Sequence, residues 1–170
     1  MNPLPLMRVS GALSPLVWEC DAKAASEAIA GWTEAGLVVR VLRGRKMRTQ
    51  RAMFDEASAA LQFPWYFGEN PDAFDECIAD LAWLAPQSGY VLVISAPDEV
   101  LVDEDVSELA WLVDSFTRAC EELARPVELG EWWDRPAVPF HIVLQAAVDK
   151  GAQLTARWTE TGAALKPLDE

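Results

Sequence analysis

The chain has few of the residues on which metal sites and disulfide frameworks depend. It contains one histidine, His141, and three cysteines, Cys20, Cys77 and Cys120, with no CxxC spacing. Structural zinc sites draw on several cysteines and histidines, and a disulfide framework uses an even number of cysteines. Each cysteine stands among apolar neighbours, as small buried residues do. We therefore expect core cysteines, and neither a metal nor a cofactor.

Long hydrophobic runs are also missing. The longest, such as Tyr90 to Ile94, are far below the roughly 20 residues that span a bilayer. Neither end carries a basic stretch followed by an apolar segment, which is the pattern of a secretory leader. We therefore expect a cytoplasmic protein that does not contact membranes.

Positive charge is scarce. The chain has 14 Lys and Arg against 27 Asp and Glu, a net charge of −13 and a pI near 4.4. Six of the basic residues fall at positions 40–51, whereas positions 69–131 hold sixteen acidic residues and only two basic ones. Such a balance argues against direct binding of nucleic acid, whose phosphates would be repelled. A basic partner is the better expectation.

Strand and helix patterns alternate along the chain. With 170 residues, of which 51% are apolar, it can bury one core and forms a single domain with extensions. β-Rich runs at 37–42, 90–94 and 140–144 predict three strands, and amphipathic spacing predicts helices capped by Thr49 and Asn70 and another from Val106. This order predicts an α/β fold with a small parallel sheet covered by helices.

The ends of the chain are harder to interpret. Residues 16–20 and the Ala-rich stretch 22–32 favour an additional strand and helix, which would make the sheet four-stranded. We accordingly divide the chain into an N-terminal extension (1–36), a central domain (37–145) and a polar C-terminal tail (146–170). The tail is expected to be a short helix or partly disordered.

The helix that Asn70 caps has two contrasting faces. Pro71 at its first position lacks only an N–H that would be unpaired there. Positions three or four apart share one side of a helix, so one face is apolar: Phe74, Cys77, Ile78 and Leu81. The other carries Asp72, Asp75, Glu76, Asp80 and Trp83. Like charges four residues apart cost a few tenths of a kcal/mol, so stability does not favour this stripe, although an ordinary solvated face remains the alternative.

The segment before this helix carries the chain's most specific motif. Tyr66-Phe67-Gly68-Glu69-Asn70 runs into Asp72-Ala73-Phe74 and then Cys77, with Gly44 and Pro64 at matching positions upstream. This pattern resembles the barstar family over about residues 37–145. The family consists of small intracellular proteins that inhibit ribonucleases by filling the active site.

The resemblance implies a barstar-like fold and a role as a ribonuclease inhibitor of the immunity or antitoxin type. Its partner would be a basic ribonuclease or nuclease toxin, and the free protein would be a monomer. Carboxylates matching Asp72 and Glu76 would then face the enzyme's phosphate-binding cations. The expected partner-binding residues are Tyr66, Phe67, Gly68, Asn70, Asp72, Asp75, Glu76, Asp80 and Trp83.

The chain also departs from the family pattern. Glu76 replaces the usual aspartate, Asp75 stands where the best known inhibitor has an aromatic, and Arg118 stands where it has an acidic residue. These changes leave the identity of the nuclease open. Among the aromatic residues, we expect either Trp65 or Phe67 to pack partly in the core.

Two other functions remain to be weighed. An enzyme is disfavoured because His141 lies in an apolar strand, Cys77 lies on a buried helix face without a base nearby, and the acidic run at 98–105 lacks the glycine and spaced oxygens of a calcium loop. We expect no catalytic residue. A barstar-fold interaction module that binds a basic partner other than a nuclease is the alternative that the sequence leaves open.

Overall fold

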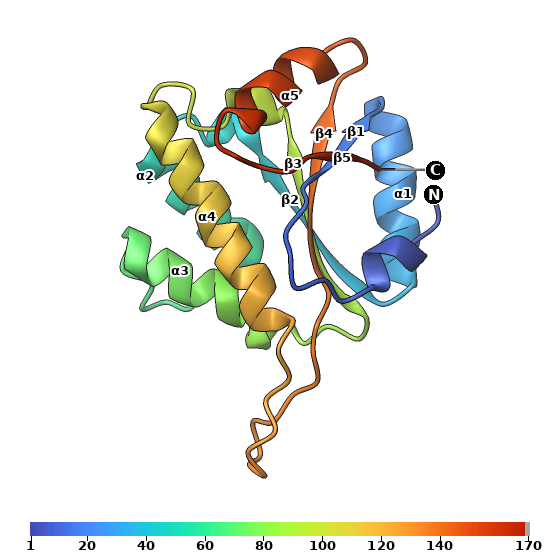
Figure 1. Cartoon of the computed structure of the whole chain (residues 1–170), viewed down its shortest axis with the longest axis vertical. Helices are drawn as coiled ribbons and strands as arrows, with labels where there is room; N and C mark the ends of the chain where they lie inside the picture. The colour runs from blue at the N-terminus through green and yellow to red at the C-terminus, as the bar shows by residue number, and fades with distance from the viewer. Residues whose placement is uncertain (169–170) are drawn as a thin grey trace.

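A computed structural model describes residues 1–168 of the chain, and a single parallel sheet lies at its centre (Figure 1). The strand order is β2-β3-β4-β1-β5, and every neighbouring pair is parallel. The strands are β1 (Leu16–Glu19), β2 (Leu37–Arg43), β3 (Gly89–Ser95), β4 (Phe140–Ala146) and β5 (Lys166–Pro167). This confirms the predicted α/β class.

Helices cover both faces of the sheet. They are α1 (Ala22–Glu34), α2 (Gln50–Leu61), α3 (Pro71–Asp80), α4 (Val106–Leu123) and α5 (Gly151–Thr159), with short 3₁₀ helices η1 (Leu4–Met7), η2 (Gly44–Lys46), η3 (Ala82–Leu84) and η4 (Pro97–Glu99). Figure 1 shows α1, with η1 beside it, on one side and α2, α4 and α5 on the other. None of the helices in residues 1–168 combines the length and apolar character needed to cross a membrane.

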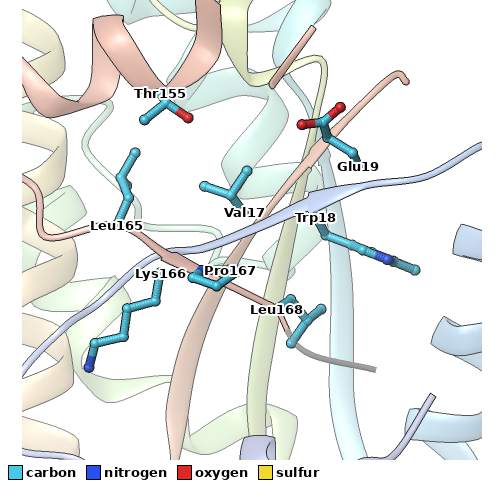
Figure 2. Close-up of a pocket in the computed structure, with 8 residues that line it drawn as sticks. All are labelled: Val17, Trp18, Glu19, Thr155, Leu165, Lys166, Pro167 and Leu168. Atoms are coloured by element: carbon cyan, nitrogen blue, oxygen red, sulfur yellow. The ribbon is translucent and has the colours of Figure 1, made fainter. Parts of the chain in front are cut away.

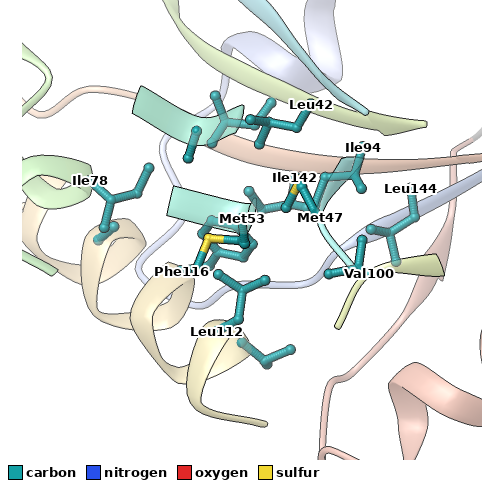
Figure 3. Packing of buried hydrophobic residues seen from close by; sticks show 14 of the residues in the cluster. Leu42, Met47, Met53, Ile78, Ile94, Val100, Leu112, Phe116, Ile142 and Leu144 are labelled. Atoms are coloured by element: carbon teal, nitrogen blue, oxygen red, sulfur yellow. The ribbon is translucent and has the colours of Figure 1, made fainter. Parts of the chain in front are cut away.

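Two hydrophobic clusters follow from the alternation of side chains along the strands. In β3, Leu92 and Ile94 face the larger cluster, which α2, α3, α4 and α5 complete. Val91 and Val93 face the smaller cluster under α1. Figure 3 shows the larger cluster, in which side chains from the strands meet those of the helices. Because β3 is buried on both faces, its sequence is apolar throughout, as expected for a central parallel strand.

The predicted number of strands was too low. The sheet described in residues 1–168 has five strands, whereas the sequence predicted three or four. The additional one is β5, where Lys166 N donates to Pro15 O at 3.1 Å and Leu168 N donates to Val17 O at 2.9 Å. Pro167 lies between these donors, at a position where the ladder requires no N–H. A two-residue strand that contains proline has no readable periodicity, which explains why it was missed.

Both ends of the chain therefore extend the same sheet. β1 pairs with β4 through residues 16–19, and β5 pairs with the outer side of β1. α5 forms within the segment that the sequence treated as a polar tail. Residues 169–170, the end of that predicted tail, lie outside the described residues.

Two of the six basic residues at positions 40–51, Arg43 and Arg48, form ion pairs within the described residues. The Arg48 guanidinium donates to Asp103 at 2.7 and 2.9 Å and to Glu99 at 2.9 Å. Gln50 adds bonds to the carboxylates of Glu104 and Glu108. The acidic loop before α4 is thus fastened to the start of α2.

Glu56 is a buried carboxylate that holds the end of β2 to α2. It is 7% exposed, and Arg43 donates to it from its backbone N at 2.9 Å, Nε at 2.7 Å and Nη2 at 2.7 Å. The hydrogen bonds from the Arg43 side chain lower the pKa of Glu56 from its ordinary value of 4.5. The native carboxylate therefore binds a proton less readily than the unfolded one.

We expect this pair to stabilise the fold above the ordinary pKa of glutamate and to lose its effect as the pH falls through the lower native value. Urea unfolding between pH 7 and pH 3 should show a steeper loss of stability for the wild type than for Glu56→Gln, which has no proton to gain. Glu27→Gln, at an exposed position beside Lys23, is the control. Parallel pH profiles for the wild type and Glu56→Gln would contradict this assignment.

Candidate functional site

The start of α3 is tied to the turn that precedes it by a single side chain. Asn70 Oδ1 accepts a hydrogen bond from Ala73 N at 3.0 Å, and Asn70 Nδ2 donates to Gly68 O at 3.2 Å. The structure thus confirms the predicted cap, with Pro71 at the first helical position. A Cβ on Gly68 would lie 2.8 Å from Asn70 Nδ2, so glycine leaves room for this bridge. The turn and the helix are fixed relative to each other.

The apolar face of α3 packs as predicted. Phe74, Cys77, Ile78 and the following Leu81 are at most 8% exposed. Phe74 reaches the aromatic rings of α4, with centroids 5.5 Å from Trp111 and 6.4 Å from Phe116. Figure 1 shows α3 at the outer side of the molecule beside α4. Its opposite face is therefore free to meet another protein.

Three carboxylates of the predicted stripe lie on that outer face. Asp72, Glu76 and Asp80 are exposed, and we call these three residues the acidic helix face. Within residues 1–168 none of them forms an ion pair. Asp80 Oδ1 accepts a hydrogen bond from Ala82 N at 3.3 Å. Asp72 also lies in the first turn, where the helix dipole favours a negative charge.

Asp75 is placed differently from its neighbours. Arg118 Nη2 of α4 lies 2.5 Å from Asp75 Oδ2 and 3.2 Å from Ser115 Oγ. Asp75 Oδ1 is buried and has no hydrogen-bond partner among the described residues. Two of the three residues that depart from the family pattern, Asp75 and Arg118, are thus partners of each other. The pair ties α3 to α4 and removes one carboxylate from the free acidic surface.

We expect the Asp75–Arg118 pair to contribute modestly to stability. The side chains are 29% and 52% exposed, so solvent screens their attraction and the coupling should be about 0.5–1 kcal/mol. A double-mutant cycle with Asp75→Ala and Arg118→Ala, measured by urea unfolding, gives this coupling directly. The exposed pair Lys23 and Glu27, 3.8 Å apart on α1, is a matched control with a smaller expected coupling. Additive effects of the two α3–α4 substitutions would contradict the prediction.

A groove of about 410 Å³ lies on the surface between α3 and α4. Four carboxylates and two guanidinium groups share it, and its lining residues are Asp75, Glu76, Ala79, Arg118, Glu121, Glu122 and Arg125. Arg125 Nη1 lies 3.7 Å from Glu122 Oε2 in an exposed pair. The groove is therefore acidic overall but also contains the positive groups of Arg118 and Arg125.

The segment before α3, residues 63–70, which we call the aromatic turn, presents two large side chains to solvent. Trp65 is 96% exposed and Tyr66 is 70% exposed, and their rings meet edge to face at 5.9 Å. Phe67 is half-buried against Phe54 and Phe63, which confirms that one of the two candidates packs in the core. Trp65 was absent from the predicted contact residues. An irregular turn has no periodicity, so nothing in the sequence distinguished the exposed ring from the buried one.

Trp83 lies beside this turn but faces inward. It is half-buried, its Nε1 donates to Leu61 O at 2.9 Å, and its ring meets Phe63 edge to face. Since its donor is already used inside the chain, any contact with a partner would be limited to its accessible edge. Of the predicted partner-binding residues, Asp75 and Trp83 thus bond to other parts of the chain, and Phe67 packs partly in the core.

The histidine and the three cysteines, which are the side chains most often reactive in enzymes, lie in environments that suit a structural role. His141 Nε2 donates to Arg8 O at 3.0 Å, and burial lowers its pKa. All three cysteines are free and buried. Burial raises the pKa of Cys120 to about 11 and, together with the charges of Asp80 and Glu76, raises the pKa of Cys77. These thiols are therefore protonated and suited to packing.

A pocket of about 480 Å³ lies at the far edge of the sheet, between β1, α5 and β5 (Figure 2). Its two charged groups, Glu19 and Lys166, point away from each other in Figure 2. Glu19 Oε2 accepts a hydrogen bond from Asp149 N at 3.3 Å, so it supports the start of α5. The polar groups do not converge, and the surface of α3 remains the better candidate.

Comparison with solved structures gave distant similarities in fold. Chains in the structures of Drosophila ORC bound to AT-rich DNA and Cdc6, and of Drosophila ORC bound to GC-rich DNA and Cdc6, each share 14% identity with this chain at a TM-score of 0.50. The alignments cover 98% of this chain, which spans only about half of those chains, 50% and 51%. At this identity the likeness concerns the fold alone.

The family comparison is more specific. No curated protein matched the chain. The family described as Barstar (barnase inhibitor) matched over residues 37–145. That range includes the capped helix, the aromatic turn and three strands of the sheet, β2, β3 and β4. The chain carrying this acidic helix therefore belongs to the Barstar family.

Proposed function

We propose that this protein inhibits a ribonuclease by placing α3 and the aromatic turn, residues 63–70, in the basic active site of the enzyme. Membership of a family of barnase inhibitors supports the proposal. The observation that carries it is the acidic helix face, whose carboxylates have no ion-pair partner within residues 1–168.

The chemistry of ribonucleases explains why such a surface would inhibit. Their active sites concentrate positive charge to stabilise the negative charge that develops on the phosphoryl oxygens during the reaction. Carboxylates on a rigid helix can neutralise those cations, and an arginine can bind one carboxylate through two parallel hydrogen bonds. Asp72 and Glu76 lie one helical turn apart, so both can enter one cleft. A helix in that position would block access of RNA to the active site. It contains no phosphodiester bond, so the enzyme could not cleave it.

The aromatic turn would add contact area next to these charges. Trp65 and Tyr66 are exposed beside the helix start, and the Asn70 bridge fixes the turn before any partner arrives. Exposed aromatic side chains on a preorganised backbone are typical anchors of protein interfaces. Phe67 and Gly68 would support the turn from within, and Asp75 and Trp83 would contribute at the margin.

The test is inhibition of a panel of purified microbial ribonucleases by the purified protein. We expect stoichiometric inhibition of at least one basic enzyme, with an association rate that falls as salt is raised, because opposite charges steer the encounter. Measurement of the rate at low and high salt separates this from an uncharged interaction. Failure to inhibit any enzyme of the panel would count against the proposal.

A second candidate is an interaction module that binds a basic protein other than a nuclease. The Asp75–Arg118 pair favours it, because Arg118 places a positive group in the α3–α4 groove. Affinity capture from the host, with an Asp72→Ala/Glu76→Ala double variant as the control bait, distinguishes the two. Specific retention of a non-nuclease basic protein by the wild type alone would favour the module.

A further inference from the structure

A second surface away from α3 also exposes large apolar side chains. Residues 126–138, which we call the tryptophan hairpin, join α4 to β4 and project from the body of the molecule (lower end of Figure 1). Leu129 is 71% exposed, Trp132 is 90% exposed and Trp133 is 49% exposed. The two indole rings meet edge to face, with centroids 5.3 Å apart.

The hairpin is held together by specific hydrogen bonds. Val127 and Arg135 exchange both backbone bonds, at 2.8 and 3.1 Å. The carboxylate of Asp134 accepts from Leu129 N at 2.9 Å and from Gly130 N at 2.8 Å, and these backbone bonds lower its pKa. Hydrogen bonds within the hairpin therefore hold its exposed tip in one conformation.

Arg135 also fastens the base of the hairpin to the end of α4. Its Nη1 donates to Arg125 O at 2.9 Å and its Nη2 donates to Glu122 O at 3.1 Å. These carbonyls belong to the last turn of α4 and the residues just beyond it, where helices leave carbonyl groups unpaired. A guanidinium there also interacts favourably with the helix dipole. The tryptophans thus keep a defined position relative to α4.

Holding such side chains in water gives the free protein no stability. Burial of a large apolar side chain stabilises a folded protein, and that gain is not realised at Trp132, which is 90% exposed. Exposed clusters of this kind on an ordered backbone are typical of interaction surfaces, and tryptophan is among the residues most enriched at binding hot spots.

The surroundings indicate which partner fits. Glu121 and Glu122 line the α3–α4 groove and lie near the end of α4, a few residues before the hairpin. The hairpin itself carries Glu128 and Glu131, close in sequence to its tryptophans. Neither Glu128 nor Glu131 has an ion-pair partner within the described part of the chain. The positive charge of Arg135 is directed at the carbonyls of α4. The apolar tip is therefore framed by unpaired negative charge.

The base of the hairpin lies near the C-terminal end of α3. Tyr90 connects the two, because its backbone N donates to Pro139 O at 2.8 Å, just after the hairpin, and its hydroxyl donates to Leu81 O at 2.7 Å, just after α3. The α3–α4 groove spans the distance between Glu76 and Arg125. One partner can therefore contact α3, the groove and the hairpin together.

We propose that the tryptophan hairpin is a second contact arm for the same basic ribonuclease, which it binds outside the catalytic cleft through Leu129 and Trp132. This inference rests on the proposed function and extends it to a separate surface of the enzyme, apolar with basic residues around it. A second copy of this chain is a poorer occupant, because at a net charge of −13 its acidic rim would repel an identical one.

The test compares single variants against a ribonuclease that the wild type inhibits. Trp132→Ala should raise the Kd at least about tenfold, mainly through faster dissociation, without changing the salt dependence, since no charge is removed. Leu4→Ala, an exposed apolar side chain in η1 at 60% exposure, is the matched control and should change the Kd less than about twofold. The melting temperature should stay the same in both.

The outcomes separate the two proposals. If Trp132→Ala binds like the wild type while Asp72→Ala does not, the hairpin proposal is wrong and the inhibitor function stands. If the wild type inhibits no ribonuclease, both are wrong. If analytical ultracentrifugation shows a wild-type dimer that Trp132→Ala dissociates, the hairpin joins copies of this chain and the proposal is overturned.

Discussion

Glu76→Ala is expected to weaken the complex with the target ribonuclease by at least about 30-fold, which corresponds to about 2 kcal/mol. Glu76 projects from the middle of α3 into solvent, at the edge of the α3–α4 groove. In the complex its carboxylate would be desolvated against a cationic group, and its removal would leave that group unpaired. Kd values from inhibition kinetics provide the measurement.

The matched control for this substitution is Glu34→Ala. Glu34 is exposed at the end of α1, on the opposite side of the sheet, and its removal changes the net charge by the same amount. We expect a small effect on association rate and none on dissociation rate. Both variants should melt like the wild type, because neither side chain has an ion-pair partner within residues 1–168. Equal affinities for the two variants would mean that the acidic helix face is only solvated surface.

The second large effect is expected at Gly44, where the chain leaves β2. A Cβ at this position would lie 2.2 Å from Ala96 O and 2.7 Å from Ser95 O. These are backbone atoms of the last residue of β3 and of the residue after it, so they cannot rotate away as a side chain could. We expect Gly44→Ala to cost about 3 kcal/mol and to lower the melting temperature by about 10 °C. Urea unfolding and thermal melts measure the two quantities.

Gly31→Ala is the control for an added methyl group. Gly31 lies inside α1, and a Cβ there would meet nothing within 4 Å. Alanine is favoured over glycine inside a helix by about 0.5–1 kcal/mol, so this variant should be more stable than the wild type. The same substitution is thus expected to have opposite signs at the two sites. A mild effect at Gly44 would show that the ends of β2 and β3 can separate easily.

Much of the fold was readable in the sequence because its signals are local or periodic. β3 is apolar at nearly every position, as a strand covered on both faces must be. α3 carries its own cap, its first-turn proline and its apolar spacing, so both its start and its buried face were predicted correctly. β5 carries none of these signals, because two residues cannot show a period.

The details of the candidate site were less predictable because they depend on contacts between distant residues. Arg118 and Asp75 are 43 positions apart, and only the packing of α4 on α3 brings them together. Arg48 reaches Glu99 and Asp103 over 51 and 55 positions. The acidic residues are visible in the sequence. Which of them are neutralised within the chain depends on these long-range contacts and could not be predicted.

Because α3 lies at the outer side of the molecule, one set of its residues packs in the core and another set is exposed to solvent. Its inward residues, Phe74 and Ile78, pack in the core, while Asp72 and Glu76 are exposed and form no ion pair within residues 1–168. Under the proposed function, substitutions at these outward positions would alter which enzyme is recognised at little cost in folding stability. A family of such proteins could acquire new targets by changing a few surface side chains on an unchanged scaffold, and the exchange of the usual aspartate for Glu76 is a change of this kind.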